Sequence, residues 1–109
     1  MSKDIQKLGG KTDIAAVTAT SAAKALSQTN SLYVIVENVG DNAVFINSGD
    51  SAVSVTFPTT STGQNGAYIS PVKGAQIVYK KNSPTDTHIA VICDTGLTST
   101  LVIQAAEGN

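Results

Sequence analysis

Residues 32–47, with the sequence LYVIVENVGDNAVFIN, contain two apolar segments that are separated by a polar turn. The segment 32–37 is apolar at nearly every position, which is typical of a central strand covered on both faces. The turn contains Gly40 followed by Asp and Asn, residue types that tolerate the backbone angles of tight turns. The segment 43–47 is apolar again, so the stretch predicts a β-hairpin of two strands.

Segments of the same kind occur on both sides of this stretch, with turn signals about every ten residues. The other predicted strands are 14–20, 53–57, 67–70, 75–80, 87–93 and 98–104, and 22–26 is either a helical turn or a bulged continuation of the first strand. No helical pattern alternates with these strands, which argues against a parallel sheet. The chain is therefore predicted to be all-β, an antiparallel β-sandwich of seven or eight strands. The spacing is compatible with jelly-roll connections, and a single closed barrel is the alternative fold.

The chain of 109 residues is long enough for one domain, which we expect over residues 13–109. Residues 1–12 are polar and are predicted to form a flexible N-terminal arm. The arm has lysines at a helical spacing with two apolar residues between them, namely Lys3, Lys7 and Lys11 with Ile5 and Leu8. One or two helical turns, ended by Gly9-Gly10, are marginal without a surface to lie on. The arm is therefore either a solvated tail or a segment that docks on a partner, and residues 105–109 are a weaker candidate of the same kind.

The composition limits the partners that this domain is expected to have. The chain has 7 Lys and no Arg against 8 acidic residues, with a pI near 5.6, so we expect no nucleic-acid partner. No apolar run approaches the length of a membrane span, and the first residues lack the apolar segment of a signal peptide, so we expect no membrane partner. The single cysteine excludes an intrachain disulfide, which fits folding in a reducing cytoplasm.

Residue types that perform catalysis or bind metals are scarce in this sequence. His88 is the one histidine, and its position within a predicted strand favours a packing or surface role over that of a catalytic base. Cys93 ends an apolar run and is interpreted as a small core side chain. A zinc site would need three or four clustered ligands, which this sequence does not offer. We therefore expect no enzyme activity, no catalytic residue, no cofactor and no metal ion.

The expected surface is polar but carries little charge. The chain has 11 Ser and 13 Thr, while charged residues make up only 14% of it. A surface of this kind loses little charge solvation when it is buried, so it permits contacts with neighbours in an assembly. Tyr68 flanks the polar loop 58–66 and is the one plausible aromatic platform for a sugar.

Parts of the chain resemble small structural proteins of tailed bacteriophages, in particular head decoration (cement) proteins of the epsilon15-like short-tailed type. The likeness covers about residues 32–109 and consists of strand and turn patterns, namely 36–47 with Gly49, 87–93, 100–103 and Glu107-Gly108.

The resemblance implies a non-enzymatic virion protein, made in the host cytoplasm, that lies on the outer surface of the capsid. It would bind the major capsid protein of a tailed phage and stabilise the shell, as a homodimer or alternatively a trimer. The candidate capsid contacts are Lys3, Ile5, Lys7, Leu8, Lys11, Tyr68, Glu107 and Asn109. The alternatives are a carbohydrate- or receptor-binding β-sandwich module and a structural component of the phage neck or tail.

Overall fold

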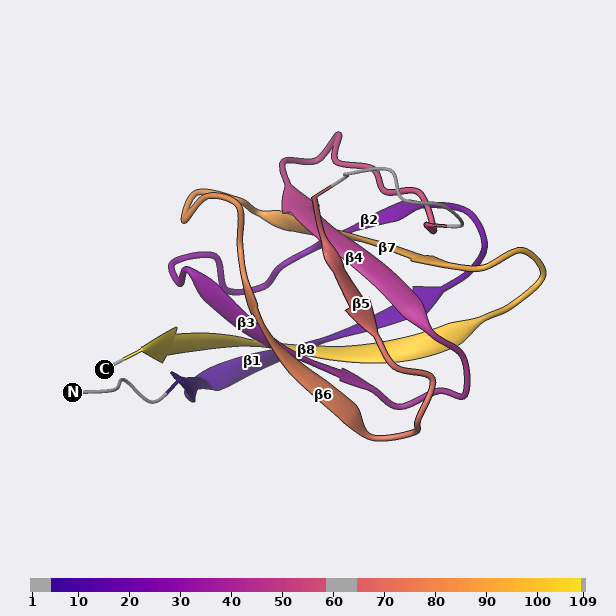
Figure 1. Cartoon of the computed structure of the whole chain (residues 1–109). Coiled ribbons are helices and arrows are strands. Elements are labelled where there is room, and N and C mark those ends of the chain that lie inside the picture. The colour runs from indigo at the N-terminus through magenta and orange to yellow at the C-terminus, as the bar shows by residue number, and fades with distance from the viewer. Residues whose placement is uncertain (1–4, 59–64, 109) are drawn as a thin grey trace.

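The computed structural model describes residues 5–58 and 65–108, and side chains within 11–58 and 65–106. The strands of the described residues are β1 (Ile5–Val17), β2 (Ala22–Ala25), β3 (Tyr33–Asn38), β4 (Val44–Gly49), β5 (Ala67–Ile69), β6 (Ala75–Lys80), β7 (His88–Cys93) and β8 (Ser99–Gly108). They form two four-stranded antiparallel sheets that pack on each other (Figure 1). The predicted all-β antiparallel sandwich is therefore confirmed.

The chain passes from one sheet to the other at every connection except the one between β4 and β5. Sheet I has the strand order β1-β8-β3-β6, and sheet II has the order β2-β7-β4-β5. Along the chain, the antiparallel pairs β4–β5, β3–β6, β2–β7 and β1–β8 are nested inside one another. The first and last strands are consequently neighbours, and they extend together beyond the other strands at the left of Figure 1.

The main core lies between the two sheets and is built from alternate residues of every strand except β2, together with Leu26, which follows β2. Its buried members are Ala15, Val17, Leu26, Val34, Val36, Val44, Ile46, Ile69, Tyr79, Ile89, Val91, Cys93, Leu101 and Ile103. Successive side chains of a strand point to opposite faces, so these positions define the inner face of each sheet and the intervening residues define the outer face. Branched aliphatic side chains dominate the core, in keeping with their preference for strands.

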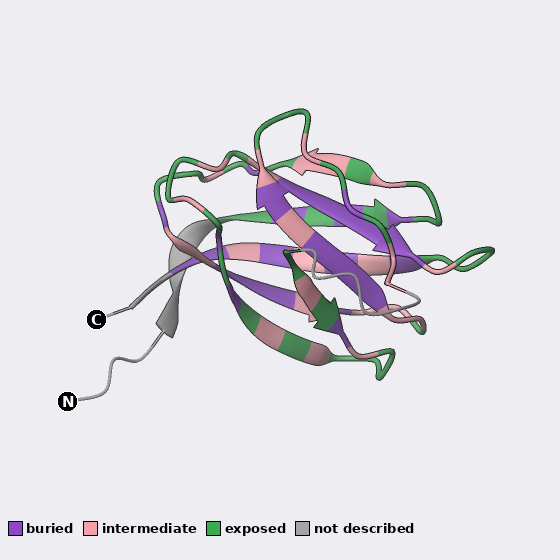
Figure 2. Ribbon diagram, turned by 45° about the horizontal axis from the view of Figure 1, so that its top comes forward, coloured by how far each residue is buried: buried purple, intermediate pink, exposed green. Residues whose placement is uncertain are grey.

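A second, smaller cluster covers the outer face of sheet II. Phe45 on β4 and Ala90 and Ile92 on β7 form its base, and Val55 of the β4–β5 connection is buried against them. Val53 and Phe57 pack beside Val55, so residues 50–58 lie over this sheet, at the top of Figure 1. With this cover, β4 and β7 are largely buried on both faces, as Figure 2 shows.

The segment 53–57 is not the strand that its alternating pattern predicted. Within the described residues it joins no ladder, and the amide of Val55 instead donates a hydrogen bond to the Ser21 hydroxyl at 3.0 Å. The alternation has a different cause, since one side of the segment packs on sheet II while the other faces solvent. Periodicity reports one-sided burial and does not by itself require a paired strand.

The predicted hairpin of 32–37 with 43–47 is also wrong. The strands β3 and β4 form where expected, but they belong to different sheets and pair with other strands. The turn between them crosses from one sheet to the other at an end of the sandwich and does not join neighbours in one ladder. The segment 22–26 is neither a helical turn nor a continuation of β1, because β2 pairs with β7 in the opposite sheet.

The side chain of Asn38, the last residue of β3, forms the hydrogen bonds that hold the polar turn after this strand. Its side chain is fully buried, donates to the carbonyl oxygens of Asn42 (2.8 Å) and Ser70 (3.0 Å), and accepts from the Ser99 hydroxyl at 2.7 Å. Gly40 is required beside it because a Cβ atom there would collide with Ser99. These contacts tie the β3–β4 and β5–β6 connections to the start of β8 at one end of the sandwich.

Candidate interaction surfaces

The structure brings the N-terminal and C-terminal candidate residues together in one two-stranded ribbon. Ile5, Gln6 and Lys7 at the start of β1 lie opposite Gly108, Glu107 and Ala106 of β8. The pairing of β3 with β8 ends at Tyr33 opposite Ala106, so the last two residues of β8 extend past β3. We call residues 5–7 with 106–108 the terminal ribbon.

A register shift separates the terminal ribbon from the rest of β1. Between Lys7 and Thr12 the β1 chain has four residues, where β8 has only Ala105 between its paired positions. Gly9-Gly10 lies within this shift, and glycine is common where a strand bulges. The helical turns predicted over this segment are therefore wrong, since the chain is a strand from Ile5 onward. Leu8 and Lys11 lie in the shift, and the Lys11 side chain is exposed.

The remaining candidate contacts are not part of this ribbon. Tyr68 lies on β5, an edge strand of sheet II, where its side chain is 55% exposed and stands opposite Phe45 in the ladder. Lys3 and Asn109 lie outside the described residues. The eight candidates therefore do not form one surface in the described part of the chain.

The outer face of sheet I presents a second surface, which we call the open face. Its described residues are Thr12, Ile14 and Ala16 of β1, Tyr33, Ile35 and Glu37 of β3, Gln76, Val78 and Lys80 of β6, and Thr100, Val102, Gln104 and Ala106 of β8. Ile14 and Val78 are 57% and 47% exposed, respectively. Neither core cluster of the described residues includes a residue of this face.

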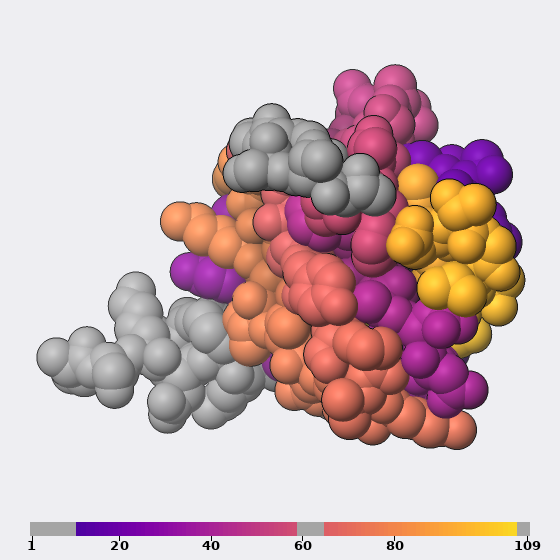
Figure 3. Space-filling view, turned by 45° about the vertical axis from the view of Figure 1, so that its right-hand side comes forward, coloured from indigo at the N-terminus to yellow at the C-terminus, as the bar shows by residue number. Residues whose placement is uncertain are grey.

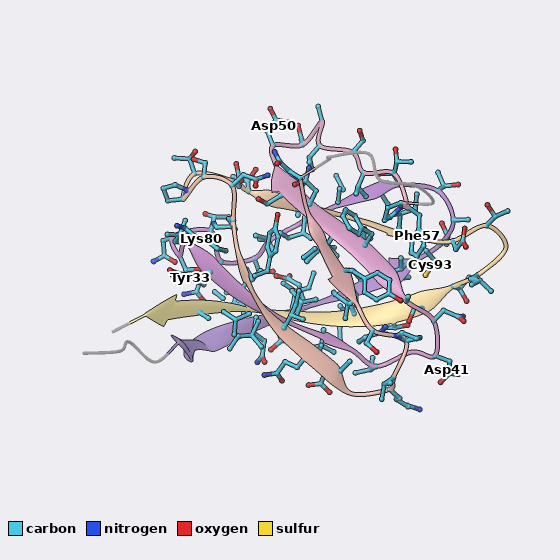
Figure 4. The ribbon with its side chains drawn as sticks, viewed as in Figure 1. Tyr33, Asp41, Asp50, Phe57, Lys80 and Cys93 are labelled. Carbon is cyan, nitrogen blue, oxygen red and sulfur yellow. The ribbon has the colours of Figure 1, made fainter. Side chains whose placement is uncertain are left out.

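The open face has a simple charge pattern. Glu37 on β3 and Lys80 on β6 are the two charged side chains among its described residues. In the ladder, Ile35 lies opposite Val78, Glu37 is two residues further along β3, and Lys80 is two residues further along the antiparallel β6. Standard strand dimensions place these two charged residues about 14 Å apart, on either side of the apolar pair. Figure 4 shows Lys80 near Tyr33, its ladder partner.

The structure places His88 and Cys93 in different surroundings. The Nδ1 atom of His88 forms a hydrogen bond with the hydroxyl of its neighbour Thr87 at 2.8 Å. Cys93 lies in the main core, where burial raises the pKa of its thiol above the ordinary value. A raised pKa disfavours the reactive thiolate, in agreement with its interpretation as a core side chain.

Lys81 is buried, although lysine is almost always an exposed residue type and nothing in the sequence patterns above pointed to it. The side chain of Lys81 is 1% exposed, and its Nζ atom donates to the carbonyl oxygens of Thr29 (3.2 Å), Pro84 (3.5 Å) and Asp86 (3.0 Å). Residues 75, 77 and 79 of β6 face inward. Continuing this two-residue period places position 81 on the inner side as well, and the sequence could have indicated the burial of Lys81 in this way. The ammonium group fastens the β2–β3 and β6–β7 connections together, which is a structural role.

The described residues contain no group of three or more metal-ligating side chains and no pocket. Among them, no helix is long and apolar enough to cross a membrane. In Figure 3 the surface around β5 and β6 bulges outward and has no deep hollow.

No family model, no curated protein and no solved structure matches this chain.

Proposed function

We propose that this protein is a non-enzymatic decoration protein that stabilises the capsid of a tailed phage from its outer surface. The observation that carries the proposal is the terminal ribbon, in which the two ends of the chain pair and extend beyond the sandwich. The major capsid protein is the proposed partner, and the decoration protein acts as a homodimer. The protein is synthesised in the host cytoplasm and then becomes part of the virion.

The chain connectivity supports this proposal at the level of the fold. We infer that the nested strand pairs, with four strands in each sheet, constitute a jelly roll. Jelly rolls occur in viral capsid proteins and also in lectins, so the fold agrees with the proposal but fits other functions as well.

The backbone of the terminal ribbon offers a specific way to bind. Glu107 and Gly108 have β1 on one side and no β3 partner on the other, because β3 stops pairing at Ala106. Strand edges with unpaired amide and carbonyl groups accept an added strand from a partner. An extended segment of the capsid protein would therefore pair with this end of β8, and the Gly9-Gly10 shift would let the ribbon adjust its direction.

Deleting residues 1–7 tests this proposal. Thr12–Val17 keep their pairing with β8, so we expect the free energy of unfolding to fall by less than about 1 kcal/mol. Binding to shells stripped of the protein should be lost, and particles reconstituted with the truncated chain should be as heat-sensitive as bare shells. The measurements are co-sedimentation with stripped shells and the temperature of particle disruption.

The matched control is Leu97→Ala, which changes an exposed side chain of the β7–β8 connection, at the opposite end of β8 from the ribbon. This variant should bind shells and protect them as the natural chain does. Full shell binding by the truncated chain would contradict attachment through the ribbon. A natural chain that neither binds stripped shells nor changes their heat resistance would refute the decoration role.

Tyr68 favours a second candidate function, that of a carbohydrate- or receptor-binding module. Its ring is the exposed aromatic side chain next to the polar loop 58–66, as a sugar platform requires. A glycan array separates the candidates, because hits that are lost in Tyr68→Ala would support a binding module. A third candidate, a neck or tail component, is distinguished by copy number, which would be about a dozen or fewer per particle rather than hundreds.

A further inference from the structure

We infer that the open face binds a second copy of this chain, across a two-fold axis that passes between Ile35 and Val78. This inference rests on the homodimer in the proposed function and specifies its interface. It does not depend on capsid binding, because it concerns the free protein in solution.

The first argument is the position of the two charges. Glu37 and Lys80 lie on neighbouring antiparallel strands, each two residues beyond the Ile35–Val78 pair and in opposite directions. The midpoint between the two charged residues therefore lies at this apolar pair. A face with one charge of each sign, placed symmetrically about its apolar centre, is complementary to a rotated copy of itself.

The second argument is the rotation that such a dimer needs. When two identical sheet faces pack together, the two-fold axis lies in the plane between them, because the rotation must reverse the direction in which each face points. An axis perpendicular to the line from Glu37 to Lys80 exchanges these two positions. Glu37 of one copy then faces Lys80 of the second copy, and the same contact forms again on the other side of the axis.

The third argument is the distribution of apolar side chains. Val78 is 47% exposed and adjoins the axis, its ladder partner Ile35 is 6% exposed beneath it, and Tyr33 and Val102 are half-buried around them. An apolar centre inside a polar rim is the usual anatomy of a protein interface. The outer face of sheet II offers no equivalent, because Val53, Val55 and Phe57 already occupy it.

The size of the open face sets the expected affinity. Four strands of about six residues give a footprint of roughly 20 Å by 20 Å, which corresponds to a small interface. Interfaces of this size form weak dimers, so we expect a dissociation constant in the micromolar range, on the order of 1–100 μM. The dimer will therefore depend on protein concentration.

The test uses the charge-reversal variants Glu37→Lys and Lys80→Glu, measured by sedimentation equilibrium on the full chain. In the homodimer of either variant, both charge contacts become repulsive, and we expect the dissociation constant to rise about tenfold or more. When the two variants are mixed, each contact in the heterodimer again joins a lysine and a glutamate. The mixture should therefore dimerise with an affinity within about threefold of that of the natural chain.

Labelling one variant with ¹⁵N lets native mass spectrometry identify the heterodimer by its intermediate mass. A natural chain that remains monomeric up to about 1 mM would overturn the inference. It would also be overturned if either variant dimerised as well as the natural chain, or if mixing restored no association. Loss of shell binding by a chain that still dimerises as described would count against the proposed function only.

A matched pair of apolar variants locates the axis. Val78→Thr changes the centre of the interface and should raise the dissociation constant about fivefold, because Thr nearly preserves shape but adds a hydroxyl group. Val72→Thr makes the same chemical change at an exposed side chain in the β5–β6 connection, outside the open face, and should alter the constant by less than about twofold. The opposite ranking of the two variants would place the axis elsewhere and overturn the assignment. Far-UV circular dichroism confirms that each variant is folded.

Discussion

The outer faces of the two sheets are completed in different ways. Sheet II is covered by its own chain, because Val53, Val55 and Phe57 pack on Phe45 and the β7 side chains. Sheet I keeps Ile14 and Val78 about half exposed. Figure 2 shows the difference in single strands, since β7 is almost wholly buried while β6 alternates between partly buried and exposed residues.

Because of this difference, substitutions on one face should affect the stability of the monomer, and substitutions on the other should affect its association with a second molecule. Apolar side chains on the outer face of sheet II are part of the folded monomer, so changing them should destabilise it. The exposed apolar side chains of the open face, Ile14 and Val78, would gain burial from the proposed second copy, so changing them should alter binding and leave the monomer intact. The following predictions test that division, beginning with the largest expected effect.

Replacing Phe45 with Ala should have the largest effect. Phe45 is 8% exposed at the base of the outer cluster, so its loss leaves a cavity and should lower the free energy of unfolding by about 3–5 kcal/mol. Tyr68→Ala is the matched control, because Tyr68 is its ladder partner but is 55% exposed, and we expect a loss below about 1 kcal/mol. Urea denaturation measures both values, and similar losses would contradict the difference in burial.

The two faces can be compared directly with Val55→Ala and Val78→Ala. Val55 is 6% exposed over sheet II, and removing its two methyl groups should cost about 1–2 kcal/mol. Val78 is 47% exposed on the open face, and the same change should cost less than about 0.5 kcal/mol in dilute, monomeric protein. If the Val78 variant lost as much stability as the Val55 variant, the open face would belong to the monomer's own packing.

Cys93 provides the smallest effect and a local probe of sheet II. It lies on β7 in the main core, so a thiol reagent at pH 8 should label it only when this sheet opens. Labelling should be faster in Val55→Ala and unchanged in Val78→Ala. Equal acceleration in both variants would show that the two faces are not independent.

The thiol also predicts a weak pH dependence. Burial raises the pKa of Cys93 in the folded state, so the folded chain retains this proton to higher pH than the unfolded chain. The stabilising contribution is present below the ordinary pKa of a thiol and is lost as the pH rises from there through the raised value. As the pH rises above 9, the free energy of unfolding should therefore fall less for Cys93→Val than for the natural chain. If the two curves of unfolding free energy against pH ran parallel, the thiol would not be the cause.

Sequence patterns predicted the strands better than their partners. The segment 75–80 forms β6 as expected, and in 87–93 the predicted alternation places Ile89 and Val91 in the main core. The hairpin of 32–37 with 43–47 failed because adjacent strands with a short turn can either pair or cross to the opposite sheet. Local spacing does not distinguish these outcomes, since the choice depends on contacts with β6, β7 and β8.

The candidate surfaces were predicted only in part. The polar ends of the chain were recognised as separate segments, but nothing in their composition indicated that Ile5 lies opposite Gly108. The open face was not predicted at all. Ile14, Val78 and Val102 come from three distant segments, and only the sheet order β1-β8-β3-β6 places them on one surface.

The sequence by itself determined that this chain is all-β, where most strands lie and which side chains of each strand are apolar. Those properties depend on φ/ψ preferences, turn residues and a two-residue period, all of which are local. The tertiary structure decided which strands pair, which sheet the chain covers with residues 50–58 and which face remains open. These outcomes depend on contacts between residues far apart in the sequence, whose burial is settled only when the complete set of strands packs together.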